Sequence, residues 1–474
     1  MTDPTTTNEL REAFQRLRAN RWKLARSGAE ERIARLQRLR AAIWARREAL
    51  QQAIQADFGK HPTETDITEI FPTLSELQHT CKHLAGWMKP ARVGRPWALL
   101  GTKSQIRHEA LGLVLVLSPW NYPVNLLLTP LIAAIAAGNA VAVKPSSKVP
   151  ATARCLQGLL SEVFPADEVA VFLGDSGVAD ALLELPFDHV FFTGSPRVGR
   201  SVMTAAARHL ASVTLELGGK SPVIVERTAD VALAAERVMW GKFINAGQTC
   251  VAPDYALVDE GLREGFVAAC RRVLEARYGA TEEARLASPF LSRLVSSQHA
   301  SGLRRLLADS VAAGAKVELG GSFSADGRGL SPTLLTGVRP DSPAMRSEIF
   351  GPILPILGYT ELEEALALVR AKDKPLALYV FSRDEAAVEH ILGSTTAGGS
   401  CVNTVIAHLA NPDLPFGGVG TSGQGSYHGV HGFRALSHAR AVLRQKRFDG
   451  LRRFYPPYTG EVQKLVERAL RYFG

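Results

Sequence analysis

Residues 112–147 read GLVLVLSPWNYPVNLLLTPLIAAIAAGNAVAVKPSS. Two short, apolar, β-rich runs, GLVLVLS and AVAVK, stand on either side of an apolar segment that is long enough for a helix. Continuous apolar strands separated by helices are typical of a parallel sheet that helices cover on both faces. This stretch therefore predicts a strand, a helix and a second, parallel strand.

The same alternation extends in both directions. It continues with VAVFLG, HVFFTGS and SVTLELGG, separated by helical segments, and predicts a doubly wound dinucleotide-binding domain. After Gly219 it restarts with SPVIVE and YALVDE, helices over 231–244 and 262–278, and later PILPILGY, LALYVFS and SCVNT, which predicts a second α/β domain. Upstream, apolar residues recur every three or four positions over 9–55, and another helical stretch covers 68–88, as in amphipathic helices.

Length and composition limit the class of protein. The 474 residues are enough for two or three compact units, and 46% hydrophobic with 21% charged residues is typical of a globular chain. The formal charge of +9 favours anionic partners such as a nucleotide cofactor. The densest basic stretch, residues 32–47, alternates with Ala, Leu and Ile at helical spacing, so we expect a solvated helix face and no nucleic-acid site.

Cysteine usage and the apolar segments indicate the cellular compartment in which we expect the protein. The five cysteines are an odd number, widely spaced and without a CxxC pair: Cys81, Cys155, Cys250, Cys270 and Cys401. We therefore expect no disulfide framework, no metal site and a reducing compartment. The first residues, MTDPTTTNEL, lack the apolar core of a signal peptide. Pro130, Gly138 and Asn139 interrupt the apolar run over 126–143, so we expect no membrane span and a cytoplasmic protein.

Three segments carry residues suited to chemistry. In FINAGQTCVAPDY, Cys250 follows a Gly-Gln-Thr turn that can present backbone N–H groups to a thiolate, although a buried structural cysteine is an equal alternative. In VTLELGGKSP, Glu216 ends a predicted strand and is placed for general-base work, although a lone glutamate there is more often an ion-pair partner. In SPWNYP, Asn121 can donate to an oxyanion or simply satisfy the turn backbone.

A fourth segment, FFTGSPRVG, is suited to phosphate binding. Gly194, Ser195 and Gly199 follow a predicted strand at the start of a helix, where backbone amides favour an anion. The pattern is not GxGxxG, so by itself it is weak. Lys144, at the end of a neighbouring predicted strand, adds a cation for a ribose or a phosphate.

Seven motifs occur in one order along the chain: PWNYP, KPS, FTGS, LELGGKSP, GQTC, EIFGP and PFGGVG. With Glu216 and Cys250 spaced like a catalytic pair, they make the chain resemble the aldehyde dehydrogenase superfamily from about Glu9 to Arg447. The variants GQTCVAPDY and PFGGVGTSGQGSYHG are most similar to the class 3 branch, which includes coniferyl aldehyde and medium-chain fatty aldehyde dehydrogenases.

The resemblance implies a mechanism. Cys250 would add to the aldehyde carbon, and the Asn121 amide and the Cys250 N–H would hold the oxyanion of the thiohemiacetal. Hydride would leave to a nicotinamide, and Glu216 would activate the water that hydrolyses the thioester to the carboxylic acid. The residues implied for binding NAD or NADP are Lys144, Ser147, Gly194, Ser195, Gly199, Leu217, Glu348 and Phe350.

The class 3 resemblance also implies a largely aromatic aldehyde channel that prefers medium-chain aliphatic or aromatic aldehydes. The implied lining residues are Tyr122, Trp240, Thr249, Phe416 and His428. The alternative is that Trp240 and Phe416 belong only to the core.

Cofactor choice depends on one departure from the family pattern. Many NAD-preferring members carry a glutamate three positions after the lysine that corresponds to Lys144, and Ser147 stands there instead. We expect NADP to be accepted at least comparably to NAD, with Lys148 adding attraction if it points the same way. The alternative is that Ser147 is neutral and Lys148 a solvated lysine.

The implied fold is an α/β, aldehyde dehydrogenase-like one, with a modified Rossmann domain that explains the missing GxGxxG. The expected parts are a cofactor-binding domain (1–88 and 108–217), a catalytic domain (218–434), a small oligomerisation hairpin element (89–107 and 435–448) and a tail (449–474). In class 3 relatives such an element supports a homodimer, and this tail lacks an apolar run that would make a membrane anchor.

Two other functions compete with that of an acid-forming dehydrogenase. A CoA-acylating dehydrogenase would share the fold and Cys250, but such relatives lack a glutamate at the position of Glu216, because water must not compete with CoA. A non-enzymatic homologue would not need the complete set of Cys250, Glu216 and Asn121.

Overall fold

The computed structural model describes residues 7–96, 99–446, 449 and 451–473. Residues 1–6, which belong to the segment expected not to be a signal peptide, lie outside the described residues. So do 97–98, 447–448, 450 and 474, which belong to the expected oligomerisation element and tail. In the described ranges, no helix combines the length and the apolarity that a membrane crossing requires.

A six-stranded sheet forms the first α/β unit, with β3 (Leu113–Leu117) at its centre. Five of its strands run parallel in the order β5-β4-β3-β6-β7. The chain thus works outward from β3 in both directions, which is the doubly wound arrangement that the alternating strands and helices predict. The other four parallel strands are β4 (Ala140–Lys144), β5 (Val169–Val171), β6 (His189–Thr193) and β7 (Ser212–Glu216).

Helices cover both faces of this sheet, and the two-residue period of β3 explains why. Val114 and Val116 point into one core, whereas Leu113 and Leu115 point into another, because successive side chains of a strand face opposite sides. The first core includes α2 (Ala29–Ala45), α3 (Arg47–Phe58), α5 (Phe71–Trp87), α6 (Asn125–Ala137) and α7 (Pro150–Val163). The second includes α1 (Thr7–Ala25), α8 (Ser176–Leu183) and α9 (Pro196–Ala207).

A short connection leads from α3 to α5 and later proves important for the site. It consists of α4 (Pro62–Thr65) and the π-helical turn η1 (Asp66–Ile70). Neither is distinguishable from the sequence pattern, which predicted one helical stretch over 68–88.

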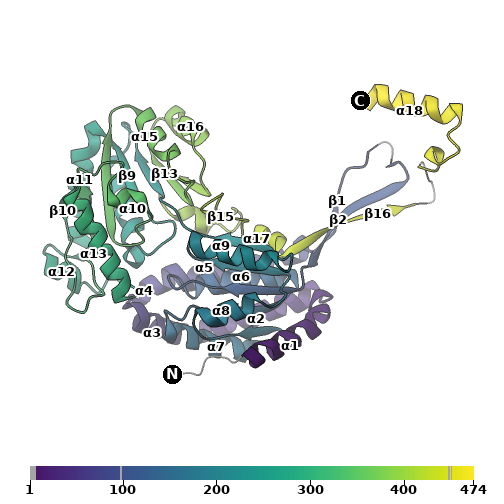
Figure 1. The fold of residues 1–474 in the computed structure, drawn as a ribbon, viewed down its shortest axis with the longest axis horizontal. Helices are drawn as coiled ribbons and strands as arrows, with labels where there is room; N and C mark the ends of the chain where they lie inside the picture. Colours follow the sequence, from purple (N-terminus) through teal and green to yellow (C-terminus); the bar gives the residue numbers. More distant parts are fainter. Residues whose placement is uncertain (1–6, 97–98, 447–448, 450, 474) are drawn as a thin grey trace.

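A seven-stranded sheet forms the second unit, in the order β10-β11-β12-β9-β8-β13-β14 and parallel except for β10. Its strands are β8 (Pro222–Val225), β9 (Tyr255–Asp259), β10 (Lys316–Leu319), β11 (Thr333–Thr336), β12 (Ile353–Tyr359), β13 (Ala377–Phe381) and β14 (Gly399–Val402). Its helices and helical turns are α10 (Val231–Phe243), η3 (Ile244–Gly247), α11 (Glu260–Tyr278), α12 (Glu282–Ala287), α13 (Ser297–Ala312), α14 (Pro343–Arg346), α15 (Leu362–Arg370), α16 (Glu385–Ser394) and η4 (Ala407–Ala410). The two units lie side by side in Figure 1, with this one in green.

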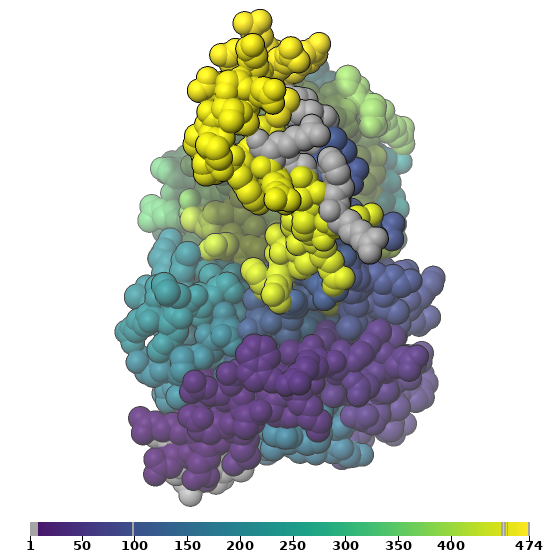
Figure 2. Space-filling model, turned by 90° about the vertical axis from the view of Figure 1, so that its right-hand side faces the viewer, coloured from purple at the N-terminus to yellow at the C-terminus, as the bar shows by residue number. Residues whose placement is uncertain are grey.

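A three-stranded antiparallel sheet projects from the body (Figure 1). It contains β1 (Ala91–Arg92), β2 (Thr102–Ala110) and β16 (Ser437–Gln445), and β2 and β16 pair along their whole length, from Ala110 opposite Ser437 to Thr102 opposite Gln445. The helical turn η5 (Leu451–Phe454) and α18 (Gly460–Phe473) follow. Figure 2 shows this C-terminal part, in yellow, above the purple N-terminal helices.

The chain returns to the first sheet before it enters β16. The two-residue strand β15 (Gly423–Gln424) pairs with the end of β7, and α17 (Gly429–Ala435) packs on α5 and α6. The sequence had assigned this segment to the catalytic domain over 218–434. A two-residue strand has no detectable period, so its sheet is decided by the partner that it meets and not by its own sequence.

Candidate active site

The three residues proposed for chemistry come from different elements. Asn121 follows β3, and Glu216 is the last residue of β7, so both lie at the carboxyl edge of the first sheet, where parallel sheets hold ligands. Cys250 comes from the second unit, on the turn after α10 and η3. The Asn121 Nδ2 group donates to the carbonyl of Gln248, two residues before Cys250, at 3.2 Å.

The turn that presents Cys250 has an unusual backbone. Asn245, Ala246 and Gly247 all have left-handed conformations, with φ of 52°, 52° and 73°. For non-glycine residues this conformation costs about 1–3 kcal/mol each, so surrounding contacts must hold it. A Cβ at Gly247 would collide with the carbonyl of Gly351, so only glycine fits there.

Buried hydrogen bonds supply those contacts. The Asn245 N–H donates to Oε1 of Glu64 at 2.8 Å, and its Nδ2 donates to the carbonyls of Asn121 and Gln248 at 2.9 and 3.1 Å. The Gln248 side chain donates to the carbonyl of Arg293 at 3.0 Å. The motif FINAGQTC contains Asn245 and Gln248, but nothing in it indicated that they hold the turn and link it to Asn121.

Burial and two acidic side chains act on the thiol of Cys250. Burial, followed in order of size by the nearby carboxylates of Glu348 and Glu216, raises the pKa of Cys250 to about 12. The N–H groups of Cys250 and Val251 do lower it, as the turn predicted, but they are outweighed. The turn thus acts as expected, whereas burial and the two carboxyls hold the thiol in its protonated form.

Glu216 is a buried carboxyl without a hydrogen-bond partner. Only 2% of the residue is exposed, and neither of its oxygens has a partner among the described residues. Burial holds its pKa well above the usual range. An unpartnered carboxyl that acts electrostatically on Cys250 is available to bind a water, and within the described ranges Glu216 has no ion pair, contrary to that alternative.

Glu348 and Phe350 lie on the segment between α14 and β12. The Glu348 carboxyl rests against Gly218, where any Cβ would collide with it, and burial followed by repulsion from Asp254 raises its pKa to about 8. Phe350 has a left-handed backbone, with φ of 51°, and its ring meets the Trp120 ring edge-on at 5.3 Å.

The carboxyl edge of the first sheet fits a dinucleotide. Ser195 caps α9, its Oγ accepting the Val198 N–H at 3.5 Å, so the first turn of that helix opens at this edge and favours a phosphate. Gly199 allows α9 to pack closely, because a Cβ there would lie 2.8 Å from the Leu217 side chain. Thr193 Oγ1 is buried at the end of β6 with no partner among the described residues, which leaves a polar group for a ligand.

The lysine and serine expected to contact the adenosine half lie after β4. Lys144 Nζ donates to the carbonyl of Gly174 at 2.8 Å, and burial lowers its pKa. Ser147 is exposed, whereas Lys148 Nζ lies 5.7 Å from the centroid of the Trp120 ring. Gly194 is half-buried against the Phe192 ring, 2.5 Å from where its Cβ would be.

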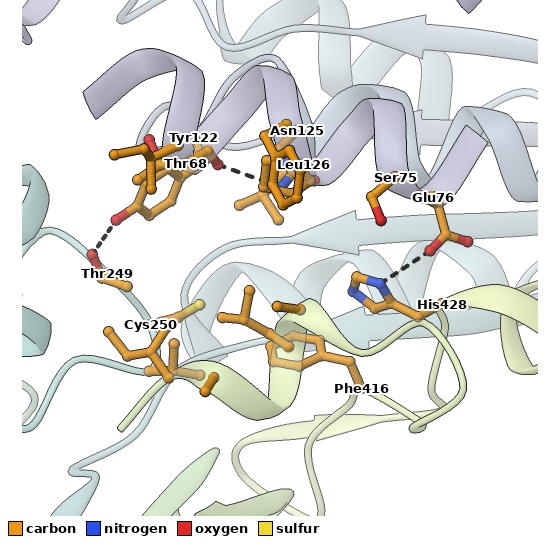
Figure 3. Close-up of a pocket in the computed structure, with 18 of the residues that line it drawn as sticks. Thr68, Ser75, Glu76, Tyr122, Asn125, Leu126, Thr249, Cys250, Phe416 and His428 are labelled. Atoms are coloured by element: carbon orange, nitrogen blue, oxygen red, sulfur yellow. Dashed lines mark hydrogen bonds and ion pairs between the residues drawn. The ribbon is translucent and has the colours of Figure 1, made fainter. Parts of the chain in front are cut away.

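A cavity of about 260 Å³ opens beside Cys250. The residues expected in the aldehyde channel all border it: Tyr122, Trp240, Thr249, Phe416 and His428. Trp240 is 42% exposed, so it is not a core residue, whereas Phe416 is 8% exposed and serves both core and cavity. The Tyr122 hydroxyl and Thr249 Oγ1 share a hydrogen bond of 2.6 Å beside Cys250, as Figure 3 shows.

The chain between α3 and α5 also contributes to this cavity, which Ile67 and Thr68 of η1 border. Lys60 and Glu69 form a fully buried pair at 3.4 Å, and Lys60 Nζ lies 4.6 Å from the centroid of the Tyr122 ring. Glu69 Oε2 accepts the N–H groups of Val124 and Asn125 at 2.9 and 3.0 Å, at the start of α6. Sequence analysis missed this pair, because a single glutamate in a helical stretch does not reveal what it faces.

Comparisons with known proteins agree with the geometry. The sequence profile described as "Aldehyde dehydrogenase family" matches residues 3–442. A "Probable coniferyl aldehyde dehydrogenase" of Pseudomonas aeruginosa is 42% identical over 97% of this chain and 96% of its own, and "Aldehyde dehydrogenase family 3 member B1" of Rattus norvegicus is 40% identical over 95% and 94%. The solved structure titled "Substrate bound state of Staphylococcus Aureus AldH" superposes with a TM-score of 0.93 at 40% identity, covering 97% of this chain and 99% of that one.

Proposed function

Because the chain belongs to the aldehyde dehydrogenase family and is an NAD(P)-dependent aldehyde dehydrogenase, we propose that Cys250, Glu216 and Asn121 carry out its oxidation of aldehydes to acids. The observation that carries this assignment is their convergence. The thiol borders the cavity, the Asn121 amide is held on the turn that carries the thiol, and Glu216 is an unpartnered carboxyl that acts on the thiol electrostatically.

In the first half of the proposed reaction, the Cys250 thiolate forms a C–S bond to the aldehyde carbon, and the carbonyl electrons move to oxygen. Asn121 Nδ2 has a second N–H besides the one given to Gln248, and this N–H and the Cys250 N–H are suited to hold that oxyanion. NAD or NADP, when bound, supplies the acceptor for the hydride that leaves the same carbon. The C=O bond re-forms and a thioester on Cys250 remains.

In the second half, Glu216 takes a proton from a water as the water attacks the thioester, and the C–S bond breaks to return the Cys250 thiolate. A carboxylate with a raised pKa is a stronger base than an exposed glutamate, which suits this role. Its buried oxygens have no competing partner among the described residues, so a water would be their hydrogen-bond donor.

The assignment is tested with the Cys250→Ala variant. It should lose dehydrogenase activity while cofactor binding is retained, because only the nucleophile is removed. The assay follows the absorbance of the reduced nicotinamide with and without CoA, and cofactor binding is measured by calorimetry. Substantial residual turnover in the purified variant contradicts the role of Cys250, and a requirement of the wild-type enzyme for CoA favours the acylating alternative.

We propose medium-chain aliphatic or aromatic aldehydes as the substrate class. The cavity has aromatic walls from Phe71, Tyr122, Trp240 and Phe416, and flat apolar side chains favour aromatic or extended apolar ligands. The name of the Pseudomonas relative, a coniferyl aldehyde dehydrogenase, supports the aromatic choice. Comparing kcat/KM across a panel of aldehydes tests it, and acetaldehyde as the best substrate would overturn it.

Three finer proposals complete the assignment. Ser147 carries no charge that would repel a 2′-phosphate, which supports acceptance of NADP at least comparably to NAD. The protein forms a homodimer through the projecting sheet, whose strand β16 lies at an edge and so leaves backbone groups for another strand. Its location is cytoplasmic, which is supported by five free cysteines.

A further inference from the structure

The cavity has a second polar region besides the one at Cys250. Glu76, on α5, and His428, at the start of α17, both border it. In Figure 3 they lie on the far side of the cavity from Cys250 and Thr249, with Phe416 between. Nothing in the proposed mechanism uses this pair.

The Glu76 carboxyl is fixed from two directions. The residue is only 3% exposed, and its Oε1 accepts the Gly429 N–H at 2.7 Å. Its Oε2 lies 3.3 Å from Nδ1 of His428, a charge contact that is not aligned well enough to count as a hydrogen bond. Gly429 is suited to this position because its φ is 46° and because a Cβ would collide with the carbonyl of Pro412.

The His428 ring is also held in one orientation. It packs against the rings of Tyr427 and Phe416, with centroid distances of 4.5 and 5.6 Å. Its backbone is left-handed, with φ of 74°, which is uncommon outside glycine and adds a cost that the packing must offset. Such strain is maintained where a side chain must be aimed.

The orientation decides which ring nitrogen carries the proton. A carboxylate only accepts, and its negative charge favours the neutral tautomer that has its proton on the ring nitrogen nearer to it, even where the alignment is poor. Here that nitrogen is Nδ1, and Nε2 is left with its lone pair. No hydrogen bond to Nε2 is found in the described part of the chain, and Figure 3 shows it on the side of the ring turned away from Glu76.

We propose that His428 Nε2 accepts a hydrogen bond from a neutral hydroxyl on the body of the aldehyde, and that the enzyme therefore selects hydroxyl-bearing aldehydes. The inference rests on the proposed use of this cavity as the aldehyde channel. A hydroxyl is the donor that suits the site, because an ammonium group would lose far more hydration on entering walls that are mostly apolar. Glu76 acts here as a positioning residue, and His428 as the residue that contacts the substrate.

The test uses the full-length enzyme with NAD or NADP and three para-substituted probes that differ in one group. These are 4-(hydroxymethyl)benzaldehyde, its isostere 4-ethylbenzaldehyde and the ether 4-(methoxymethyl)benzaldehyde, together with the same three substituents on cinnamaldehyde to vary the reach. An aliphatic hydroxyl stays protonated at the assay pH, so the probe keeps its donor. The readout is the ratio of kcat/KM for the hydroxymethyl probe to that for the ethyl probe.

In His428→Phe the hydroxymethyl-to-ethyl ratio should fall about tenfold from the wild-type value in at least one of the two series, the size of effect of one hydrogen bond. His428→Gly accepts a positive φ without strain and offers no side-chain acceptor, so it should show the same fall if the Phe variant does not fold. Melting temperatures identify variants that fold. The matched control is Ser75→Ala, which removes the other small polar group of this region and should keep the wild-type ratio.

The Glu76→Gln variant tests whether Glu76 sets the tautomer of the His428 ring or only supports the surrounding structure. The carbonyl of the substituted side chain can still accept from Gly429, but an amide N–H group now faces Nδ1 in place of a negative charge. The preference for a proton on Nδ1 is then reversed, so the proton moves to Nε2 and this nitrogen becomes a donor. The methoxymethyl probe should therefore gain several-fold over the ethyl probe in kcat/KM, which loss of a purely structural contact would not produce.

The outcomes separate this inference from the proposed function. Poor turnover of all six probes beside good turnover of acetaldehyde removes the aromatic aldehyde channel itself. Good turnover of the ethyl probes with the same ratio in wild type, His428→Phe and His428→Gly overturns the role of His428 and leaves the channel intact. A ratio that falls in Ser75→Ala but not in the His428 variants assigns the hydroxyl to Ser75 and also overturns the inference.

Discussion

At Cys250 the electrostatic environment opposes the reactive form of the nucleophile. A thiol pKa of about 12 leaves roughly one molecule in ten thousand ionised at about pH 8. Burial is the largest cause of this pKa, and the carboxylates of Glu348 and Glu216 add to it in that order. The enzyme without ligands therefore holds its thiol in an unreactive state, which protects it from oxidants and alkylating agents.

This state predicts the pH dependence of alkylation. Without cofactor, the rate of Cys250 carbamidomethylation by iodoacetamide should rise by up to about tenfold per pH unit between about pH 7 and pH 9, and less steeply where Glu348 ionises. Glu348→Gln should react faster above about pH 8, because removing a negative charge lowers the thiol pKa and because Glu348 itself ionises at about 8. Below that pH the two proteins should converge.

Mass spectrometry of the peptide that contains Cys250 measures these rates. The control is Glu162→Gln. It removes an exposed carboxylate that pairs with Arg46, and both residues are far from Cys250 in the sequence. A Glu348→Gln variant that reacts more slowly than the wild type would reverse the sign of the argument and refute it.

At Glu216 the prediction concerns the relative rates of hydride transfer and deacylation. Glu216→Gln should slow deacylation more than hydride transfer, because the amide cannot take a proton from water. A pre-steady-state burst of reduced cofactor should appear, followed by a stalled steady state. Stopped-flow fluorescence measures both phases, and equal slowing of the two would count against the general-base role.

At Ser147 the prediction concerns cofactor choice. Ser147→Glu should raise the KM for NADP far more than that for NAD, because a carboxylate repels the 2′-phosphate and accepts hydrogen bonds from ribose hydroxyls. Ser147→Ala is the matched control and should leave both KM values close to wild type. Initial rates at saturating aldehyde provide the comparison, and wild-type activity confined to NAD would show the inference to be wrong.

Among the elements, the connection between α3 and α5 links the cavity wall to the rest of the fold. Glu69 is fully buried with Lys60 and also accepts two N–H groups at the start of α6. A carboxylate at the start of a helix offsets the partial positive charge of that end. The Glu69 side chain thus holds both Lys60 and the start of α6. Because Lys60 lies over the Tyr122 ring, Glu69 also acts indirectly on Tyr122.

Glu69→Gln should lower the free energy of unfolding by about 3 kcal/mol or more, because it leaves the Lys60 ammonium buried without its charged partner. Glu162→Gln, which breaks an exposed pair with Arg46, should change it by about 1 kcal/mol or less. Urea unfolding followed by tryptophan fluorescence measures both. Equal effects of the two substitutions would mean that the buried pair is not a structural anchor.

At the scale of the whole molecule, the projecting sheet has more surface than its own strands can cover. The strand β16 is at an edge of the three-stranded sheet, its residues are mostly exposed, and Leu443 on it is 50% exposed. An exposed edge with an apolar side chain is a pairing surface for another chain. This is the physical basis for the proposed homodimer.

Leu443→Asp should therefore shift the protein from dimer toward monomer at micromolar concentration, because it places a charge in the proposed contact. Val317→Asp is the matched control, since Val317 is 42% exposed on β10, the edge strand of the seven-stranded sheet. Light scattering after size exclusion gives the mass of each. A wild-type protein with the mass of one chain would remove the proposal.

The sequence by itself determined the elements and the order of the motifs. The strands from β3 to β9 and the helices between them lie where apolar runs and helical periods predicted them, because these patterns depend on neighbouring residues that face the same core. The motifs alone were enough to pair Cys250 with Glu216, because the types of residue and their order can be read directly from the sequence. Elements without a period, such as β15 and the π-helical turn η1, were not predictable in this way.

Only the tertiary structure decided what lies around those motifs. Glu76 accepts from Gly429 across 353 positions, and Glu69 meets Val124 across 55, so no local pattern encodes either contact. The same holds for the thiol of Cys250. The turn alone favours the thiolate, whereas burial and two carboxylates that are distant in the sequence but close in space raise the pKa. Desolvation and charge act through space, and the distances in space exist only once both sheets have packed against each other.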